Sequence, residues 1–328
     1  MKIYLLAWLS LLMAVSTMRG QQLPQYSFYM LNPYFYNPAY VGLAGTLLAH
    51  GTYRHQWVGM PGAPEGQYLD AHLPVYVLRG GVGARLSRDQ IGVHQTLQAM
   101  LHYAYHLDIG RSGLFSVGVG AGYLQYLLDG AKLRTPEGEY GTGGSFTHND
   151  PLFPEGKVTA GTPLLEAGVF FRWLQVDLGV AIQPVHAPLI TVSAEGRFRL
   201  RAVPQYTGMG AYRIQLSDKW SATPSFLIKF DPAATQIEIS SLFRWRENTF
   251  AGCSVRGIVP SARDALVLYG GFRITEKISF AYAYDLPLSS LTDAHRGSHE
   301  LLLRYDLSKP IGEGRLPPII YNPRFWGN

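Results

Sequence analysis

Long runs in which apolar residues alternate with polar residues or glycine constrain this chain more than any other feature. Every second residue is apolar along 165–173 and again along 176–182, and the same spacing returns along 115–123 and 301–307. Successive side chains of a strand point to opposite faces, so this spacing predicts β-strands with one apolar face. No long stretch has the 3.6-residue period of a helix, and the sequence therefore predicts an all-β fold.

Three features favour a membrane barrel over a soluble sandwich. The expected strands are about nine to eleven residues long, which is the length that a tilted strand needs to cross a bilayer. Aromatic residues, especially tyrosine, cluster at strand ends, as in the interfacial girdles of barrels. The second face of the strands is polar, glycine-rich and charged with both signs. An open sheet edge would leave unpaired backbone groups in lipid. We therefore expect a closed, transmembrane antiparallel β-barrel of the outer-membrane type.

The expected strands number about fourteen, an even number as in bacterial single-chain barrels. They are 45–56, 66–74, 80–88, 93–108, 112–128, 164–173, 174–183, 205–216, 219–230, 236–246, 249–258, 264–275, 277–286 and 298–308. With the N-terminus in the periplasm, the periplasmic turns are short. The outer loops, which include 89–92, 129–163 and 183–204, are mostly longer. We expect the long loop 129–163 either to bind cargo or to cover the barrel, and 191–202 fits no strand pattern.

The two ends of the chain are predicted to lie outside the barrel. Residues 1–20 have a positively charged start, an apolar run at 3–15 and small residues near Gly20, as in a secretory signal peptide cleaved before Gln21. Residues 21–44 form an Asn-Pro-rich segment, 45–308 the barrel and 309–328 a periplasmic tail. The whole chain has a net charge of +5, and loss of Lys2 and Arg19 lowers it to +3, too weak for a nucleic-acid binder.

Several motifs, in a fixed order along the chain, carry a family resemblance. They are 21–33 (QQLPQYSFYMLNP), 37–42 (NPAYVG), 53–57 (YRHQW), 62–64 (GAP), 89–92 (DQIG), 103–105 (YAY), 282–285 (YAYD) and 297–300 (GSHE). Together they resemble the PorP/SprF family of Bacteroidetes type IX secretion-system membrane proteins. The resemblance implies an outer-membrane protein that works with the secretion and gliding machinery. It also implies partners: secreted adhesins with C-terminal sorting domains, and periplasmic motor or peptidoglycan-binding components.

The N-terminal motifs supply most of the candidate site residues. Asn-Pro pairs favour turns, so we expect 21–44 to form an aromatic-rich plug or rim before the first strand. The segment could be a purely structural turn or could bind a partner, and Trp57 could anchor the barrel at the membrane interface or take part in recognition. The residues concerned are Asn32, Pro33, Asn37, Pro38, Tyr40, Gly42, Arg54 and Trp57.

Motifs that would indicate catalysis or cofactor binding have structural interpretations here. His102 and His106 lie on one face of a strand but about 13 Å apart, too far to share a metal ion. The glycines of 118–122 lie within a strand and favour close packing rather than a dinucleotide loop. The residues of 298–300 include Ser, His and Glu, but neighbours on a strand face opposite ways. One cysteine, Cys253, excludes a disulfide scaffold. We expect no enzyme, no cofactor and no metal.

The charges expected on the inner face are of both signs. This pattern fits a salt-bridged, largely blocked interior or a wet but unselective channel, since a selective pore would show one dominant sign. A porin or small-molecule channel is therefore the alternative function. The inner set is His50, Arg54, Asp70, His72, Arg85, His102, His106, Glu166, Arg172, Asp177, Arg213, Lys229, Glu238, Arg244, Arg273, Asp285, Glu300, Arg304 and Asp306.

The tail 309–328 combines prolines with an apolar, aromatic end. Prolines prevent a regular strand or helix, and exposed apolar groups favour docking against another surface. The tail could fold back into the barrel mouth or bind a periplasmic component of the secretion machinery. The candidate contact residues are Tyr321, Arg324, Phe325 and Trp326.

Overall fold

The fold is seen in a computed structural model of the chain. The residues that the structure describes are 24–110, 112–136, 138–141, 146–150, 154–192, 199–232, 234–246, 248–257, 264–288, 295–309 and 311. The signal peptide expected at 1–20 and the candidate tail residues Tyr321, Arg324, Phe325 and Trp326 lie outside them.

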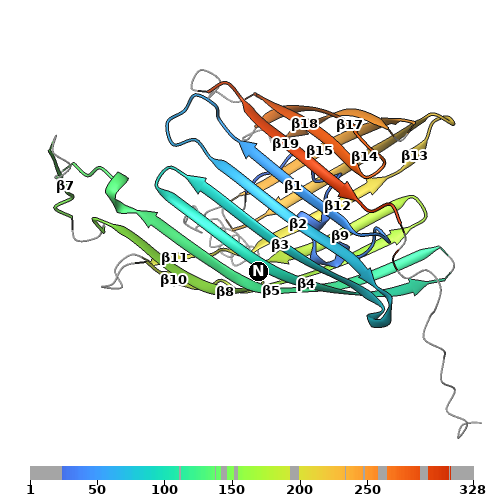
Figure 1. The fold of residues 1–328 in the computed structure, drawn as a ribbon, viewed down its shortest axis with the longest axis horizontal. Coiled ribbons are helices and arrows are strands. Elements are labelled where there is room, and N and C mark those ends of the chain that lie inside the picture. Colours follow the sequence, from blue (N-terminus) through green and yellow to red (C-terminus); the bar gives the residue numbers. More distant parts are fainter. Residues whose placement is uncertain are drawn as a thin grey trace, which may run out of the picture.

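Fourteen antiparallel strands close into a barrel, as the alternation predicted (Figure 1). Their bounds are β1 (Leu48–His55), β2 (Glu65–Val75), β3 (Gly80–Ile91), β4 (His94–Ile109), β5 (Gly113–Asp129), β8 (Lys157–Trp173), β9 (Val176–Gln183), β12 (Gln205–Tyr212), β14 (Trp220–Phe230), β15 (Thr235–Trp245), β16 (Thr249–Arg256), β17 (Ala265–Arg273), β18 (Ile278–Pro287) and β19 (Ser298–Asp306). Each strand pairs with its neighbours in the chain, and β1 pairs with β19. The two-residue strand β13 (Ile214–Gln215) continues β12 along β14. Closure therefore leaves no unpaired sheet edge.

One end of the barrel carries short turns and the other carries longer loops, which we call the turn end and the loop end. Strands β4, β5 and β8 have 16, 17 and 17 residues and extend beyond the others at the loop end. Two hairpins lie there, β6 (Glu139–Tyr140) with β7 (Phe146–Thr147) and β10 (Leu189–Thr191) with β11 (Arg199–Arg201) (Figure 1).

The structure corrects two of the expected loops and supplies a position for another segment. The loop expected at 129–163 ends earlier, because β8 begins at Lys157, which pairs with Asp129 of β5. The loop expected at 89–92 is wrong, because β3 stays paired with β4 as far as Ile91 opposite His94, and only Gly92 and Val93 make the turn. The unassigned segment 191–202 contributes to the β10–β11 hairpin, whose Ile190 is buried against Tyr126 of β5. The hairpin is therefore held by apolar contacts that strand periodicity alone does not reveal.

The outer face of the barrel is an apolar belt. Leu101, Val119, Leu165, Val180 and Leu303 are each at least half exposed, because alternation turns them away from the interior. Aromatic residues flank the belt. At the turn end Trp220 of β14 lies opposite Trp245 of β15, as expected for rings at a membrane interface. No helix in the described part of the chain is long and apolar enough to cross a membrane.

The segment before β1 lies inside the barrel, and we call its described part, residues 24–47, the plug. Tyr34, Tyr36, Ala39 and Val41 are buried almost completely. Two 3-10 helices, η1 (Pro33–Phe35) and η2 (Pro38–Tyr40), begin at the two Asn-Pro pairs. The side chain of Asn37 caps η2 by accepting a hydrogen bond of 2.9 Å from the Ala39 amide. The Asn-Pro motif therefore sets the turns that fold the plug.

Candidate functional site

A cluster of buried charges, which we call the central cluster, joins five strands of the wall beside the plug. Arg54 of β1 contacts Asp285 of β18 at 2.5 Å and Glu300 of β19 at 2.8 Å. Arg256 of β16 contacts Glu238 of β15 and Asp285, each at 2.7 Å. All five side chains are at most 4% exposed. Buried charges are tolerated only when they are paired and hydrogen-bonded, as they are here.

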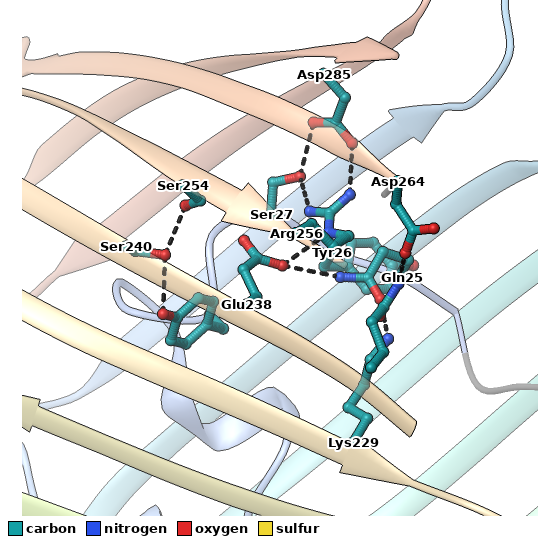
Figure 2. A network of polar contacts seen from close by, with 12 residues as sticks. Gln25, Tyr26, Ser27, Lys229, Glu238, Ser240, Ser254, Arg256, Asp264 and Asp285 are labelled. Carbon is teal, nitrogen blue, oxygen red and sulfur yellow. Dashed lines mark hydrogen bonds and ion pairs between the residues drawn. The ribbon is translucent and has the colours of Figure 1, made fainter. Parts of the chain in front are cut away.

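Ser27 ties the plug into this charge cluster (Figure 2). Its hydroxyl oxygen accepts hydrogen bonds of 2.9 Å from Arg54 and from Arg256 and donates one of 3.0 Å to Asp285. Its backbone amide donates a hydrogen bond of 2.8 Å to Glu300. Hydrogen bonds to charged groups are among the stronger ones in proteins. One plug residue therefore holds β1, β16, β18 and β19 together.

The charges of the cluster balance. Lys229 of β14 donates to the side-chain oxygen of Gln25, and the amide nitrogen of Gln25 donates to Glu238 at 3.3 Å. With Lys229 the cluster holds three cations and three anions, namely Arg54, Arg256 and Lys229 against Glu238, Asp285 and Glu300. The expected salt-bridged interior is confirmed for this layer, which presents no excess of either sign.

A second polar group holds the other side of the plug. Glu166 of β8 contacts Arg85 of β3, and it lies 2.9 Å from the Nε2 atom of His102 of β4. The Nδ1 atom of His102 is 2.7 Å from the hydroxyl of Tyr34 in η1, and Arg85 donates a hydrogen bond of 3.0 Å to the carbonyl of Phe35. His102 is thus a link between wall and plug, and His106 is a separate one, 2.9 Å from the Val41 carbonyl.

Glycines of the wall give the plug room. A Cβ atom on Gly118 would lie 2.3 Å from the Ala39 nitrogen, and one on Gly168 would lie 2.3 Å from the Asn37 side-chain oxygen. On Gly81 it would lie 2.6 Å from the Cα of Gly42. Such distances are too short for any side chain, so the close-packing interpretation of the 118–122 glycines is confirmed at Gly118.

Burial also keeps the plug tyrosines neutral. Removal from water raises the pKa of Tyr34 and Tyr36 well above the usual value of a tyrosine, because the charged form cannot be hydrated. The hydroxyl of Tyr36 donates a hydrogen bond of 3.1 Å to the Tyr26 carbonyl and accepts one of 3.2 Å from the Tyr26 amide. An uncharged contact thereby joins the start of the plug to its middle.

The structure brings seven of the eight N-terminal candidate residues together inside the barrel. Asn32 donates a hydrogen bond of 2.6 Å to Asp70, and Asn37 donates one of 2.9 Å to the Val169 carbonyl. Trp57 is apart from them, at the loop end, 39% exposed. A partner-binding role for these residues stays a prediction. Those inside the barrel are Asn32, Pro33, Asn37, Pro38, Tyr40, Gly42 and Arg54.

Sequence reasoning missed two residues of the central cluster. The inner set predicted from the sequence omits Arg256. Its position in the strand indicates an inward side chain, because Val255 faces outward and Arg256 follows Ser254 by two residues. Ser27 gave no such signal, because its contact with Asp285 spans 258 positions of the chain.

The residues of the Ser-His-Glu run at 298–300 do not converge on one site. His299 points outward and lies 2.6 Å from the Tyr282 hydroxyl, whereas Glu300 points inward to Arg54. Among the described residues no group of three or more His, Cys, Asp or Glu side chains is placed to hold a metal ion.

Two cavities flank the plug and share no lining residue. The loop-end cavity, of about 150 Å³, lies between Gln25, Glu166 and the β10–β11 hairpin. The turn-end cavity, of about 470 Å³, lies between the plug and the inner faces of the strands. The plug therefore lies between these two cavities.

Comparisons with known proteins give one family. No curated protein matches. Among solved structures, the outer membrane protein Omp33 of Acinetobacter baumannii is 6% identical, with a TM-score of 0.45 over 80% of this chain and 97% of Omp33. A FadL homologue of Pseudomonas aeruginosa is 12% identical, with a TM-score of 0.46 over 82% and 92%. The monoaromatic hydrocarbon channel CymD is 10% identical, with a TM-score of 0.48 over 87% and 92%. The family model "Type IX secretion system membrane protein PorP/SprF" matches residues 18–305, which include the plug and nearly the whole barrel.

Proposed function

Because the chain belongs to the PorP/SprF family of type IX secretion system membrane proteins, we propose that it is a non-enzymatic, plugged barrel that binds proteins of that machinery. It sits in outer-membrane lipid through its apolar belt. Its partners are secreted proteins and adhesins with C-terminal sorting domains on one side, and periplasmic secretion or peptidoglycan-binding components on the other. A signal peptide at 1–20 directs it out of the cytoplasm.

The plug is the observation that carries this proposal. A solute channel needs an open lumen, whereas Ser27 and Tyr34 bind opposite parts of the wall through buried charged groups. Opening a path would separate buried charged side chains from their partners, which costs about 3–5 kcal/mol for each broken pair. Binding at the two ends of a closed barrel needs no such step. The balanced charge cluster therefore favours an adaptor over a channel.

The asymmetry of the two ends supports an orientation. Bacterial outer-membrane barrels have short periplasmic turns and longer outer loops. The loop end, with the β6–β7 and β10–β11 hairpins, then faces the cell exterior and offers surface to secreted proteins. The turn end faces the periplasm, and β19 ends on that side at Asp306.

Site-directed photocrosslinking in native outer membranes tests the proposal. A photoreactive residue at exposed Arg134 of the loop end should capture secreted proteins with C-terminal sorting domains, and one at Ser217 of the turn end should capture periplasmic components. The matched control is Leu101, which is 69% exposed on the lipid-facing belt and should capture neither. Mass spectrometry identifies the products. Identical products at all three positions, or none at Arg134 and Ser217, would contradict partner binding.

Conductance of the purified barrel tests the alternative. In a planar bilayer the wild-type barrel should remain closed, and a variant with a displaced plug, such as Gly118→Val, should conduct and so prove that the assay detects opening. A steady open-pore current from the wild-type barrel would favour the porin alternative.

A further inference from the structure

The turn-end cavity is ringed by arginines. Four strands and one junction between strands each contribute one inward-facing arginine at this end of the barrel. They are Arg172 in β8, Arg213 between β12 and β13, Arg244 in β15, Arg273 in β17 and Arg304 in β19. The lumen as a whole carries both signs, but one sign dominates here.

The acids of the cavity wall do not balance these arginines. Asp177 and Asp306 are the acidic residues that line it. Arg172 contacts Asp177 at 2.7 Å, Arg213 lies 3.7 Å from the same carboxylate, and Arg304 contacts Asp306 at 3.0 Å. Arg244 has a further interaction of its own, and the other four arginines against two aspartates still leave a surplus of two positive charges among the described residues of the lining. This contrasts with the central cluster, where cations and anions are equal in number.

The surplus faces the open side of the cavity. Arg273 is exposed and makes no ion pair with any residue in the described part of the chain. In two of the adjoining turns each acid is followed by a base, Asp218 by Lys219 and Glu276 by Lys277. Positive charge in a concave, low-dielectric site focuses the field and concentrates anions there.

The floor of the cavity is apolar. Met30, Leu31 and Leu43 of the plug line it together with Phe250 and Phe280 of the wall. Its volume of about 470 Å³ lies within the range of roughly 300–1,000 Å³ that is usual for ligand pockets. A ligand that fits both surfaces carries anionic groups at the mouth and apolar groups inside.

We propose that the turn-end cavity is a binding site for an acidic peptide segment with interspersed apolar side chains. Arginine suits this ligand, because its planar guanidinium binds a carboxylate through two parallel hydrogen bonds. The segment belongs to a protein on the turn side of the membrane. The identity of that side as the periplasm rests on the proposed function, but the binding chemistry does not.

Charge argues against the chain's own tail as the occupant. Residues 309–328 carry Lys309, Arg315 and Arg324 against one acid, Glu313. A cationic tail would be repelled by the arginine ring, whereas an acidic segment would be attracted.

Peptide binding to the purified, full-length barrel tests the site. The probe is a fluorescent peptide of sequence Leu-Glu-Glu-Leu-Glu-Glu with blocked ends, and its neutral counterpart has Gln in place of every Glu. Fluorescence anisotropy should detect binding of the acidic peptide that weakens as ionic strength rises. The double variant Arg213→Gln/Arg273→Gln should lower the affinity at least about tenfold, since two charge-assisted contacts are lost.

The matched control removes the same charge from the same end but outside the cavity. Lys219→Gln/Lys277→Gln should change the affinity less than about twofold, because rim charges act mainly on association rates. Heat-modifiable migration on gels verifies that each variant is folded. Equal weakening in both double variants, or equal binding of the neutral peptide, would overturn the proposal. Full displacement of the peptide by citrate at equal carboxylate concentration would likewise overturn it, in favour of a small-anion site.

Two further outcomes separate the alternatives. Truncation after Ser308 should leave peptide binding unchanged, and binding that appears only after truncation would make the tail the occupant and the proposal wrong. Because binding is measured on the isolated barrel, its failure would leave partner capture at Arg134 and Ser217 unaffected. Loss of that capture with intact peptide binding would instead count against the proposed function.

Discussion

The hydroxyl of Ser27 accepts a hydrogen bond of 2.9 Å from Arg256, although 229 positions of the chain separate the two residues. The contact joins the plug to β16 in the wall of the barrel. It places a neutral hydroxyl between two guanidinium groups, those of Arg54 and Arg256, and one carboxylate, that of Asp285. The plug is therefore part of the charge cluster, and its removal would leave the cluster with unmet hydrogen bonds.

Ser27→Ala should destabilise the barrel by about 1–3 kcal/mol, because two buried arginines lose an acceptor that water cannot replace. The midpoint of the heat-induced shift in gel migration should fall accordingly. Ser217→Ala, in an exposed turn, is the control and should leave the midpoint unchanged. Equal midpoints for Ser27→Ala and the wild type would mean that the hydroxyl contributes little.

Arg54→Met should be more harmful, by about 3–5 kcal/mol, since it leaves buried carboxylates without their cation. Asp285 keeps Arg256, but Glu300 loses its ion-pair partner. Addition of Glu300→Gln should restore part of the stability in a urea titration. Arg88→Met, on an arginine whose side chain bonds only Gln90 and Gln95 among the described residues, should have little effect. A double variant less stable than Arg54→Met would refute the charge-balance explanation.

Gly118→Ala should displace the plug, because the added methyl group would lie 2.3 Å from the Ala39 nitrogen and cannot avoid backbone atoms. We expect a folded barrel in which limited proteolysis cuts the plug faster than in the wild type. Gly51→Ala is the matched control, since a Cβ on Gly51 meets nothing within 4 Å. Equal cleavage rates in the two variants would argue against tight packing at η2.

The raised pKa of the plug tyrosines predicts a loss of stability at high pH. The folded state holds the tyrosine proton more tightly than the unfolded state, whose pKa is about 10. The contribution is therefore complete below pH of about 10 and is lost as pH rises from there towards the folded-state pKa. Tyr36→Phe should flatten this loss in thermal scans across the alkaline range. The exposed Tyr76→Phe is the control, and an identical slope in both variants would contradict the prediction.

An epitope tag inserted after Gly141, beside the β6–β7 hairpin, should be accessible to antibody on intact cells. A tag inserted after Ser217 at the turn end should become accessible only after the outer membrane is permeabilised. The reverse pattern would invert the orientation and assign the arginine-ringed cavity to the cell exterior.

Much of the fold could be predicted because alternation is a local property. A period of two assigns each residue to one face of its own strand, so Arg54, Glu238 and Glu300 could be assigned to the interior without knowledge of any partner. The same period predicts the number of strands. Applied throughout β16, it also assigns Arg256 to the interior.

The sequence by itself therefore determined the strands, their two faces and the turn-forming Asn-Pro pairs of the plug. Only the tertiary structure decided that Ser27 meets Arg256, that Gly118 faces Ala39 and that five arginines share one cavity. It also decided the length of β3 and the position of the β10–β11 hairpin. The reason is that these relationships arise when the sheet closes and surrounds the plug. Closure brings together residues whose separation in the chain carries no periodic signal.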